Sequence, residues 1–382
     1  MGISPCKYIN NLRMSLMINS VAPDKLTKNE GLKESNPLLA GTIAQALVDT
    51  STDAFTQDDY EFVKFHGVYQ QDDRDKRKTG KQYSMMVRTR FPGGTLSAPQ
   101  YVACDELATR YGNNTLRITT RQDFQFYGVL KGNLRQTIKA LNEALITTIA
   151  ACGDVARNVL APSTPATSPL VARVIEEAHK ISQALTPKTK AYHSIWLEGK
   201  ELDLNSEENK TFVDPLYGKT YLPRKFKVAF AIPPLNDVDI FTNDLGFVVI
   251  TENGELAGYN VVAGGGMGMS HGNTETFPRL ADLLGFVRPE QLEAVSKAVL
   301  TIHRDFGDRT NRKHARLKYV LEARGADWCR QEIEQRTGFK LEPARPFQFT
   351  RQGDLLGWHR QLDGRFFLGI FVEKIGRASC RE

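Results

Sequence analysis

The stretch SMMVRTRFPGG (84–94), followed by LRITTRQDFQF (116–126), decides the fold of the first half of the chain. SMMVRTR alternates as a strand does, and PGG is typical of a turn. A helix is predicted from about Ser97 to Tyr111, NTLRITT and DFQFYGVL predict two more strands, and a second amphipathic helix is predicted over about 134–149. The order strand, helix, strand, strand, helix predicts a ferredoxin-like half over residues 84–150.

The residues on either side of this unit divide into further segments. Residues 1–35 lack the unbroken apolar core of a signal peptide, and we expect a poorly ordered lead there. Residues 36–83 are predicted to hold a helix, over about 36–48, and a turn-rich polar arm, KFHGVYQQDDRDKR (64–77), rather than a core strand. Residues 151–345 alternate strands and helices and predict a mixed α/β domain.

The predicted elements of this second domain follow one another closely. Its strands are predicted at 191–199, 226–233, 246–252 and 256–264. Its helices are predicted near 276–285, 289–303, 309–323 and 326–337. Together with the ferredoxin-like half, this pattern predicts an α+β enzyme.

Composition and charge exclude several classes of protein. The 382 residues are 41% hydrophobic and 25% charged, as in an ordinary globular protein. No apolar run approaches the roughly 20 residues that a membrane span needs, and we expect a cytoplasmic protein. The net charge of +6 is mild and does not by itself indicate nucleic acid. The basic residues lie in short clusters, which favours a small anionic ligand.

The cysteines predict no metal site within this chain. There are five, and no two lie closer than 48 residues apart in sequence. No C-x-x-C pair or zinc-like spacing exists, and the dispersed positions do not suggest a disulfide framework. We interpret each as a buried or incidental thiol.

Arginines gather on the two motifs that open the ferredoxin-like half. Alternate side chains share one face of a strand, so Arg88 and Arg90 are predicted to project together. The same alternation groups three side chains of the next motif, namely Arg117, Thr119 and Arg121, and it groups Gln125 with Tyr127. Several guanidinium groups on one face favour a polycarboxylate site over a solvated cationic face.

Two more motifs carry isolated cations. YLPRKFK (221–227) places Arg224, Lys225 and Lys227 at the mouth of an apolar strand, with the two lysines on one face. Two explanations fit this pattern about equally well. The cations could form a site for a small oxyanion, or they could be a charged strand edge that prevents aggregation. In VARNVLAPS, Arg157 is placed between a helix and a proline-bearing loop, where an arginine is more often a surface or capping residue.

Glycines and a basic run lie further along the chain. Gly264, Gly265 and Gly266 in VVAGGGMGM permit close approach of a ligand, although a tight turn after a strand explains them too. The dinucleotide and P-loop patterns both fail. In HRDFGDRTNRKHARLKY (303–319), Arg309, Arg312 and Arg316 recur at helical spacing. A solvated face, a nucleic-acid patch and an anionic cofactor site stay open as explanations.

Taken together, these segments resemble the siroheme-containing nitrite and sulfite reductases, and within them the hemoprotein component of bacterial sulfite reductase. The resemblance runs from about Leu38 to Glu373. It is carried, in the order of the family, by KFHGVYQQDDRD, RTRFPGG, LRITTRQDFQF, ARNVLAPS, YLPRKFK, NDVDIF, VVAGGG, HGN and DFGDRTNRKHARLKY. It implies siroheme, an iron tetrapyrrole with eight carboxylates, coupled to a 4Fe–4S cluster.

The resemblance also implies roles for single residues. The residues that it places around the substrate are Arg88, Arg157, Lys225 and Lys227. Those that it places at the carboxylates and edge of siroheme are Arg117, Thr119, Arg121, Gln125, Arg224, Gly264, Gly265, Gly266 and Arg316. The family commonly has lysine at the position of Arg316 and histidine at that of Tyr127.

The implied activity is the six-electron reduction of sulfite to sulfide by an assimilatory sulfite reductase. The nearest alternative is a siroheme nitrite reductase, but the lysine pair and the QQDDRD arm favour sulfite. A basic nucleic-acid-binding protein is an alternative from another class, and it predicts steep salt dependence and no pigment. The implied electron donor is an NADPH-dependent flavoprotein subunit or, failing that, ferredoxin. Neither nucleic acid nor a membrane is expected as a partner.

One feature of the family is missing. Its cluster is held by a C-x5-C pair and a later C-x3-C pair, and neither pair occurs here. We expect both in sequence that follows residue 373 in the source gene, so the predicted fold is truncated before the iron–sulfur domain and the fragment alone is expected to be inactive. Residues 346–374 are predicted to begin a second ferredoxin-like half, and residues 375–382 to be a non-native tail.

Overall fold

The computed structural model describes residues 26–72, 77–165 and 167–372. Its helices are α2 (Lys28–Ser35), α3 (Ile43–Val48), α4 (Gln57–Val63), α5 (Ala98–Arg110), α6 (Leu134–Glu143), α7 (Pro169–Ala184), α8 (Glu207–Lys210), α9 (Leu292–Phe306), α10 (Leu317–Arg324) and α11 (Ala326–Thr337), with a π-helix at His193–Glu198. Its strands are β1 (Val68–Asp72), β2 (Tyr83–Arg88), β3 (Leu116–Ile118), β4 (Phe124–Val129), β5 (Ala156–Leu160), β6 (Phe226–Ala231), β7 (Leu235–Asn236), β8 (Leu245–Glu252), β9 (Glu255–Ala263), β10 (Asp282–Val287), β11 (Arg351–Gln352), β12 (Gly357–Arg360) and β13 (Phe366–Gly369). None of the described helices is long and apolar enough to cross a lipid bilayer.

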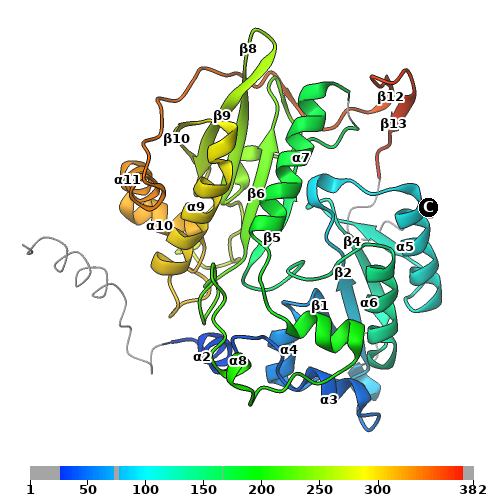
Figure 1. Cartoon of the computed structure of the whole chain (residues 1–382). Helices are drawn as coiled ribbons and strands as arrows, with labels where there is room; N and C mark the ends of the chain where they lie inside the picture. Colours follow the sequence, from blue (N-terminus) through cyan, green and yellow to red (C-terminus); the bar gives the residue numbers. More distant parts are fainter. Residues whose placement is uncertain (1–25, 73–76, 166, 373–382) are drawn as a thin grey trace, which may run out of the picture.

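The first sheet is the predicted ferredoxin-like unit with one strand added. Its order is β1-β2-β4-β3, and every neighbouring pair is antiparallel. The predicted succession of strand, helix, strand, strand, helix is confirmed by β2, α5, β3, β4 and α6. A capping box between Ser97 and Gln100 fixes the start of α5. Helices α5 and α6 lie together on the outer side of the sheet (Figure 1).

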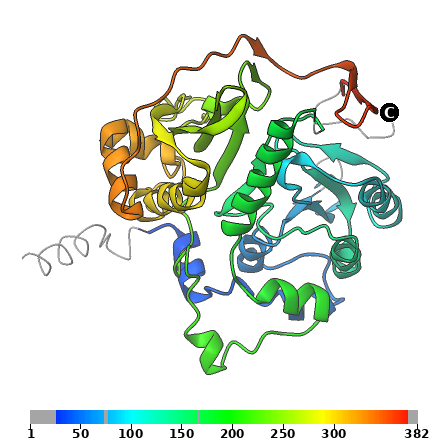
Figure 2. The same ribbon diagram turned by 45° about the horizontal axis from the view of Figure 1, so that its top comes forward.

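The second sheet has the order β10-β9-β8-β6-β5. Strands β5, β6 and β8 run parallel to one another, and β9 is antiparallel to both β8 and β10. The central strands are almost wholly buried, which explains their continuous apolar runs. Helices α7 and α9 cover one face of this sheet (Figure 1), and α7 lies between the two sheets when the molecule is tilted (Figure 2).

The parallel strands bring three strand starts to one edge of the second sheet. The register pairs Ala156 with Phe226 and Val228 with Leu245, so β5, β6 and β8 all begin there. The hairpin between β8 and β9 turns at the opposite end, where Asn253 and Gly254 have positive φ. Residues just before or just inside these strand starts therefore come close together in space.

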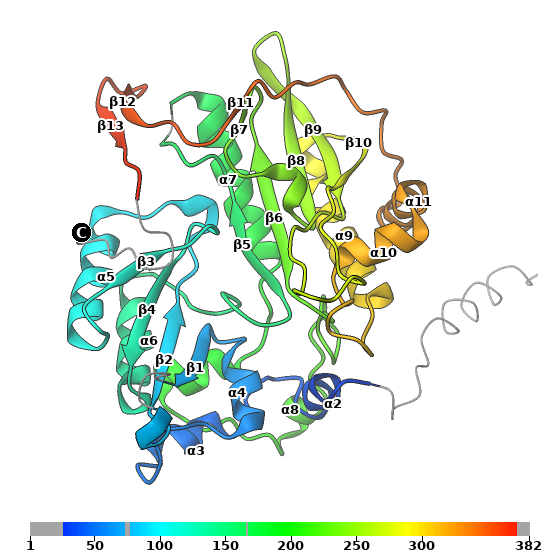
Figure 3. The ribbon, with the colours of Figure 1, turned by 180° about the vertical axis from the view of Figure 1, so that it is seen from behind.

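The segment after α11 crosses the larger sheet and ends beside the smaller one (Figures 2 and 3). On the way, β11 pairs with β7, and β12 and β13 then form a two-stranded hairpin. Among the described residues this hairpin makes no strand pairing with the four-stranded sheet. The expectation that residues 346–374 begin a second ferredoxin-like half stays a prediction, and the tail at 375–382 lies outside the described residues.

Two N-terminal expectations are corrected. The single helix predicted over 36–48 is confined to 43–48, because Leu39 and Gly41 have left-handed φ values and a Cβ on Gly41 would lie 2.3 Å from Asp59 Oδ1. Residues 28–35, expected within a poorly ordered lead, form α2 and bury two charged side chains. Residues 1–25 lie outside the described part of the chain.

Tertiary pairing overrides the local pattern at three further places. The polar arm at 64–77 contains β1, an edge strand of the first sheet. The strand predicted at 191–199 is the π-helix, which packs against α6. The helix predicted at 276–285 gives way to β10, which pairs with β9. Alternation and amphipathicity over so few residues do not distinguish a strand from a helix.

Helix ends and the basic run differ as well. Helix α6 stops at Glu143, short of the predicted 149. Of the helix predicted over 309–323, only the part from Leu317 onward is helical. The three arginines before it, Arg309, Arg312 and Arg316, do not line one helix face, because each bonds to a different part of the protein.

His66 is a buried histidine that the fold holds neutral. Trp196 Nε1 donates to His66 Nδ1 at 2.7 Å, so the ring proton is on Nε2, which lies 2.8 Å from the Leu39 carbonyl oxygen. Burial lowers the pKa of His66 to about 4. Protonation would place a charge in the core and break the bond from Trp196.

We expect the free energy of unfolding to fall in acid partly because of this residue. The folded pKa is below the usual value, so the unfolded state binds more protons, and stability is lost as pH falls from about 6.5 towards 4. The full contribution is roughly 3 kcal/mol. Urea unfolding at several pH values should show a shallower acid dependence for His66→Gln than for the parent, while His193→Gln, at an exposed position, should match the parent. Equal slopes for His66→Gln and the parent would contradict this account.

Candidate functional site

A row of polar side chains crosses the first sheet. Strand register places Gln125 opposite both Arg88 on β2 and Arg117 on β3. With its amide oxygen turned towards Arg88, Gln125 accepts from Arg88 Nε at 2.8 Å and donates to Tyr127 Oη. Arg88 Nη1 also donates to Cys152 Sγ at 3.3 Å, and the Arg117 guanidinium lies 4.3 Å from the centroid of the Tyr127 ring. Four of the grouped side chains thus occupy one row.

Arg90 does not project with Arg88, as the strand alternation had predicted. It lies beyond the end of β2 and is buried. Its guanidinium donates to the Ser182 hydroxyl at 2.9 Å and to the Ser182 carbonyl at 3.1 Å. Arg90 therefore ties the first sheet to α7 instead of joining the polar row.

A tight turn carries Arg121 from the first sheet to the second. The Thr119 hydroxyl accepts the N–H groups of Arg121 and Asp123, each at 3.2 Å. Arg121 Nη2 donates to Asn243 Oδ1 at 2.6 Å, and Arg121 Nη1 lies 3.5 Å from the Val228 carbonyl oxygen. Burial lowers the pKa of Arg121 to about 10. Thr119 thus shapes the turn, and Arg121 spans the two sheets.

Arg157 belongs to β5, not to a helix end as the sequence had predicted. Its Nε and Nη1 donate to the carbonyl oxygens of Gly153 and Ala151, both at 3.0 Å. Its positive charge lowers the pKa of the Tyr69 hydroxyl and of the Cys152 thiol, although burial raises both overall. Arg157 therefore lies beside the same thiol that Arg88 contacts.

The lysine pair lies at the start of β6, on the shared edge of the second sheet. Burial, followed by the charges of Arg157 and Lys227, lowers the pKa of Lys225 to about 7. Burial, followed by the charge of Arg121, lowers the pKa of Lys227 to about 8. Burial also lowers the pKa of Arg224. Like charges crowd these lysines, so their ammonium forms are poorly stabilised until an anion is present.

Arg316 joins the group through Asp244. Its Nη2 lies 2.9 Å from each carboxylate oxygen of Asp244, a fully buried residue just before β8. The same carboxylate accepts the backbone N–H of Lys227 at 2.9 Å. Arg316 also contributes to the lowered pKa of both Lys225 and Lys227. Asp244 therefore connects Arg316 to the strand that carries the lysines.

The glycines after β9 are needed by the protein itself. A Cβ on Gly265 would lie 2.1 Å from the Phe241 carbonyl oxygen, and Gly264 has a φ of 82°. The amide N–H groups of Gly264, Gly265 and Gly266 bond to the carbonyl oxygens of Asp244, Asn243 and Arg279, respectively. Any ligand would therefore meet Cα atoms and carbonyl groups here, not free amides. The buried Lys318 holds the loop by donating to the Gly268 carbonyl at 2.7 Å.

Seven cations form what we call the basic cluster. Its members are Arg88, Arg121, Arg157, Arg224, Lys225, Lys227 and Arg316. Within the described ranges, only Arg316 among them forms an ion pair. The structure thus brings together all four residues expected around the substrate. Arg117 faces Tyr127 instead, and Thr119 and the glycines serve the backbone.

Sequence reasoning missed the acidic and amide groups beside this cluster. The sequence alone assigned no role to Asn243 or Asp244, although their place just before an apolar strand is a usable signal. Asp123 is buried inside the quoted arginine motif, where burial raises the pKa of its carboxyl to about 7 despite the neighbouring arginines. No such signal marked Cys152, which the sequence treated as an incidental thiol.

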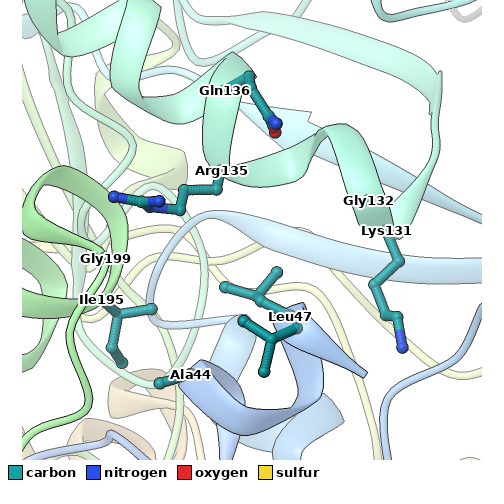
Figure 4. Close-up of a pocket in the computed structure, with 9 residues that line it drawn as sticks. Ala44, Leu47, Lys131, Gly132, Arg135, Gln136, Ile195 and Gly199 are labelled. Carbon is teal, nitrogen blue, oxygen red and sulfur yellow. The ribbon is translucent and has the colours of Figure 1, made fainter. Parts of the chain in front are cut away.

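A separate hollow of about 160 Å³ lies between α3, α6 and the π-helix (Figure 4). Lys131, Arg135 and Ile195 are among the residues that line it, and none of the predicted site residues does. In the part of the chain that the structure describes, no three His, Cys, Asp or Glu side chains are grouped so that they could hold a metal ion.

Comparisons with known proteins place the chain in a family. The model of the nitrite/sulfite reductase ferredoxin-like half domain matches residues 76–144, and that of the nitrite and sulphite reductase 4Fe-4S domain matches residues 176–341. A sulfite reductase (NADPH) hemoprotein beta-component from Myxococcus xanthus is 51% identical over 365 residues, which are 94% of this chain and 64% of that protein. The chain belongs to the nitrite and sulfite reductase family.

A second relative and one solved structure are also similar to this chain. The protein of the same name from Shouchella clausii is 47% identical over 350 residues, covering 90% of this chain and 61% of that protein. The solved structure of the Mycobacterium tuberculosis NirA protein has the same fold, with a TM-score of 0.70 at 23% identity, over 89% of this chain and 59% of that one. The chain thus spans roughly three fifths of the length of the relatives that it matches.

The family match confirms the predicted fold class, a ferredoxin-like half followed by a mixed α/β domain. The stretch that matches the 4Fe-4S domain contains a single cysteine, Cys329. That thiol is buried, and burial raises its pKa to about 12. A 4Fe–4S cluster is commonly held by four cysteine thiolates, so one buried, protonated thiol does not supply a ligand set, and Cys329 does not fit as a ligand.

Proposed function

We propose that the chain is the siroheme-binding part of an assimilatory sulfite reductase hemoprotein, which reduces sulfite to sulfide. The observation that carries this proposal is the basic cluster, in which seven cations from both sheets meet and only one has a carboxylate partner among the described residues. Uncompensated cations in a partly buried site are costly, and a polyanionic ligand removes that cost.

The residues fit siroheme in two groups. Arg121 and Arg316, at the junction of the sheets, would hold carboxylates, since arginine binds a carboxylate through two parallel hydrogen bonds. Arg88, Arg157, Lys225 and Lys227 would face the substrate, because Arg157 and the lysines act on one another electrostatically and Arg88 and Arg157 both act on Cys152. Gln125, on the first sheet, and Arg224, just before β6 of the second sheet, would contact the edge of siroheme.

The protein side of the chemistry follows from the charges. Siroheme, when bound, supplies iron that binds sulfur and passes electrons to it. The basic cluster would bind the sulfite dianion. It would also stabilise the negative charge that develops on each oxygen before that oxygen leaves as water. Because the pKa of Lys225 is about 7, its ammonium can release a proton near neutral pH. Among the described residues, no group of side chains could hold a 4Fe–4S cluster. The names of the relatives include NADPH, which supports NADPH as the source of electrons. A flavoprotein subunit is the donor that we propose, with ferredoxin as the alternative.

Pigments that differ in their number of carboxylates give a direct test of the proposed siroheme site in this chain. We expect siroheme and uroporphyrin, each with eight carboxylates, to bind at least about tenfold more tightly than protoporphyrin, which has two and offers fewer charge-assisted bonds. Absorbance titrations at pH 7 and at pH 9 measure this. Affinity for the octacarboxylates should change little between the two pH values, because Arg121, with a pKa of about 10, keeps its charge while the lysines that face the substrate lose theirs.

The control is Arg135→Gln, which removes an arginine from the separate hollow and should leave the titration unchanged. Equal affinity for the two- and eight-carboxylate pigments would contradict the proposal. So would a single-stranded oligonucleotide that binds more tightly than siroheme, because that result would favour the nucleic-acid alternative.

A further inference from the structure

Helix α2 brings two charged side chains into the interior. Glu30 and Lys33 are buried, and Lys33 Nζ donates to Glu30 Oε1 at 2.6 Å and to the Leu222 carbonyl at 2.8 Å. Glu30 also forms an ion pair with Arg309, whose Nη2 donates to the Tyr221 carbonyl at 2.7 Å. The helix is therefore bonded to the segment that leads into the lysine strand.

Asp154 completes this group. Arg312 grips its carboxylate with two hydrogen bonds, of 2.8 and 3.1 Å, and Lys33 Nζ lies 3.6 Å away. Burial raises the pKa of Asp154, but the charge of Lys33 and the bonds from Arg312 lower it to about 2 overall. We call the set Glu30, Lys33, Asp154, Arg309 and Arg312 the ionic clamp. It joins three segments that are far apart in sequence.

The clamp acts on Arg157 through the backbone. Arg157 donates to the carbonyl groups of Ala151 and Gly153 and also bonds to the Tyr69 hydroxyl. The path of residues 151–155 therefore helps to set its position. Gly153 has a φ of 89°, and a Cβ there would lie 2.8 Å from the Phe65 ring. The next residue is Asp154, whose side chain is fixed by the clamp.

The clamp also acts on the lysine strand. The N–H of Leu222 donates to the Asp154 carbonyl at 3.1 Å, and that of Phe226 donates to the Val155 carbonyl at 3.0 Å. Lys33 holds the Leu222 carbonyl from the other side. The two backbone stretches that present Arg157 and Lys225 are thus fastened to each other and to one carboxylate.

We propose that Asp154 is a positioning residue, which, gripped by Arg312 and Lys33, fixes how Arg157 and Lys225 face one another in the basic cluster. The proposal deepens the proposed function and rests on it for its meaning in catalysis. None of the clamp residues needs to touch substrate or cofactor. Misplacing a reacting group by about 1 Å can lower the rate about 10²-fold. The gain in rate from correct positioning can therefore offset the desolvation of the buried charges in the clamp.

The pKa of Lys225 reports this arrangement in the ligand-free chain. It is lowered by burial and by Arg157, Lys227, Arg316 and Arg224, so it is sensitive to where Arg157 lies. If Asp154→Asn lets Arg157 move away, the pKa of Lys225 should rise by about one unit. A direct charge effect has the opposite sign, because removing a carboxylate lowers the pKa of a nearby lysine. A purely structural role lowers the unfolding temperature and leaves the pKa of Lys225 where it was.

The experiment follows the Lys225 side chain by NMR through a pH titration, with Lys225→Arg used to assign the signal. Asp154→Asn and Arg312→Lys are compared with the parent. Arg312→Lys keeps the positive charge but loses the pair of hydrogen bonds to Asp154. Because the Arg312 side chain is 29% exposed, we expect this variant to fold even if Asp154→Asn does not, and it then tests the proposal alone. Glu177→Gln, which removes an equally buried, ion-paired carboxylate on α7, is the control.

A rise in the pKa of Lys225 in both clamp variants, with none in Glu177→Gln, is the expected result. An unchanged or lowered value in the variants that fold overturns the proposal. Since no pigment or substrate is present, a chain that shows the rise yet fails to bind siroheme would refute the proposed function and not the positioning role.

Discussion

Replacing Lys225 with methionine in the complete reductase is expected to lower the rate of sulfite reduction by about 10²- to 10³-fold while siroheme content stays near that of the parent. Methionine keeps the length of the side chain and removes its charge and its proton. Lys225 lies among Arg157, Lys227, Arg316 and Arg224, so it is the group whose charge depends most on an anion. Lys227→Met should behave in the same way. The readouts are turnover with an artificial electron donor and the absorbance ratio of pigment to protein.

Lys225→Arg separates charge from proton transfer. Arginine restores the positive charge but does not release a proton near neutrality. We expect partial recovery of the affinity for sulfite and loss of the ionisation near pH 7 from the rate profile. In the parent, activity should decline above about pH 7 to 8 as the lysines lose their protons. Lys219→Met, at an exposed position, is the matched control. Unchanged sulfite kinetics in a fully pigmented Lys225/Lys227 double variant would end this assignment.

Arg121→Ala is expected to give the reverse result, with most of the siroheme lost on purification. Arg121 crosses from the turn after β3 to Asn243 and lies beside Lys227 and Arg316. Losing a charge-assisted contact to a carboxylate typically weakens binding by about 1.5–3 kcal/mol, or roughly 10- to 150-fold. Pigment retained after gel filtration, normalised to protein, measures the effect.

Two comparisons keep the Arg121 result specific. Arg110→Ala, which removes an exposed arginine that lies 5.1 Å from the centroid of the Tyr111 ring, should retain the pigment. In the ligand-free chain, Arg121→Ala should raise the pKa of Lys227, because Arg121 is its strongest like-charge neighbour. Full pigment retention by Arg121→Ala at normal folding would show that another residue holds that part of the ligand.

The sequence predicted well wherever a local pattern and the tertiary contacts agree. The unit from β2 to α6 and strands β6, β8 and β9 lie close to their predicted positions, and α11 lies at 326–337, as predicted. Their apolar faces are unambiguous, since each is long or strictly alternating. Arg88, Arg157, Lys225 and Lys227 were grouped by resemblance, and the structure brings them together.

The failures have one physical origin. Residues 191–199 and β10 are set by what they pack against, respectively α6 and β9, and no local pattern records such partners. Helix α2 was missed because Glu30 and Lys33 are charged residues, which a sequence pattern assigns to the surface. Their burial is favourable because they pair with each other, with Arg309 and with Asp154. The basic run at 309–316 was predicted as a helix face, but its arginines are used one by one in bonds to distant segments.

The parallel strands β5, β6 and β8 place the basic cluster at their starts and leave the β8–β9 turn at the far end. Strand β8 runs from Leu245 to Glu252, so the turn at Asn253–Gly254 stands about 26 Å from the cluster along the strand. A fluorophore or a surface tether attached at that turn would lie far from the basic cluster. The same geometry makes the turn a natural anchoring point for immobilising the protein on an electrode with the cationic end facing solution.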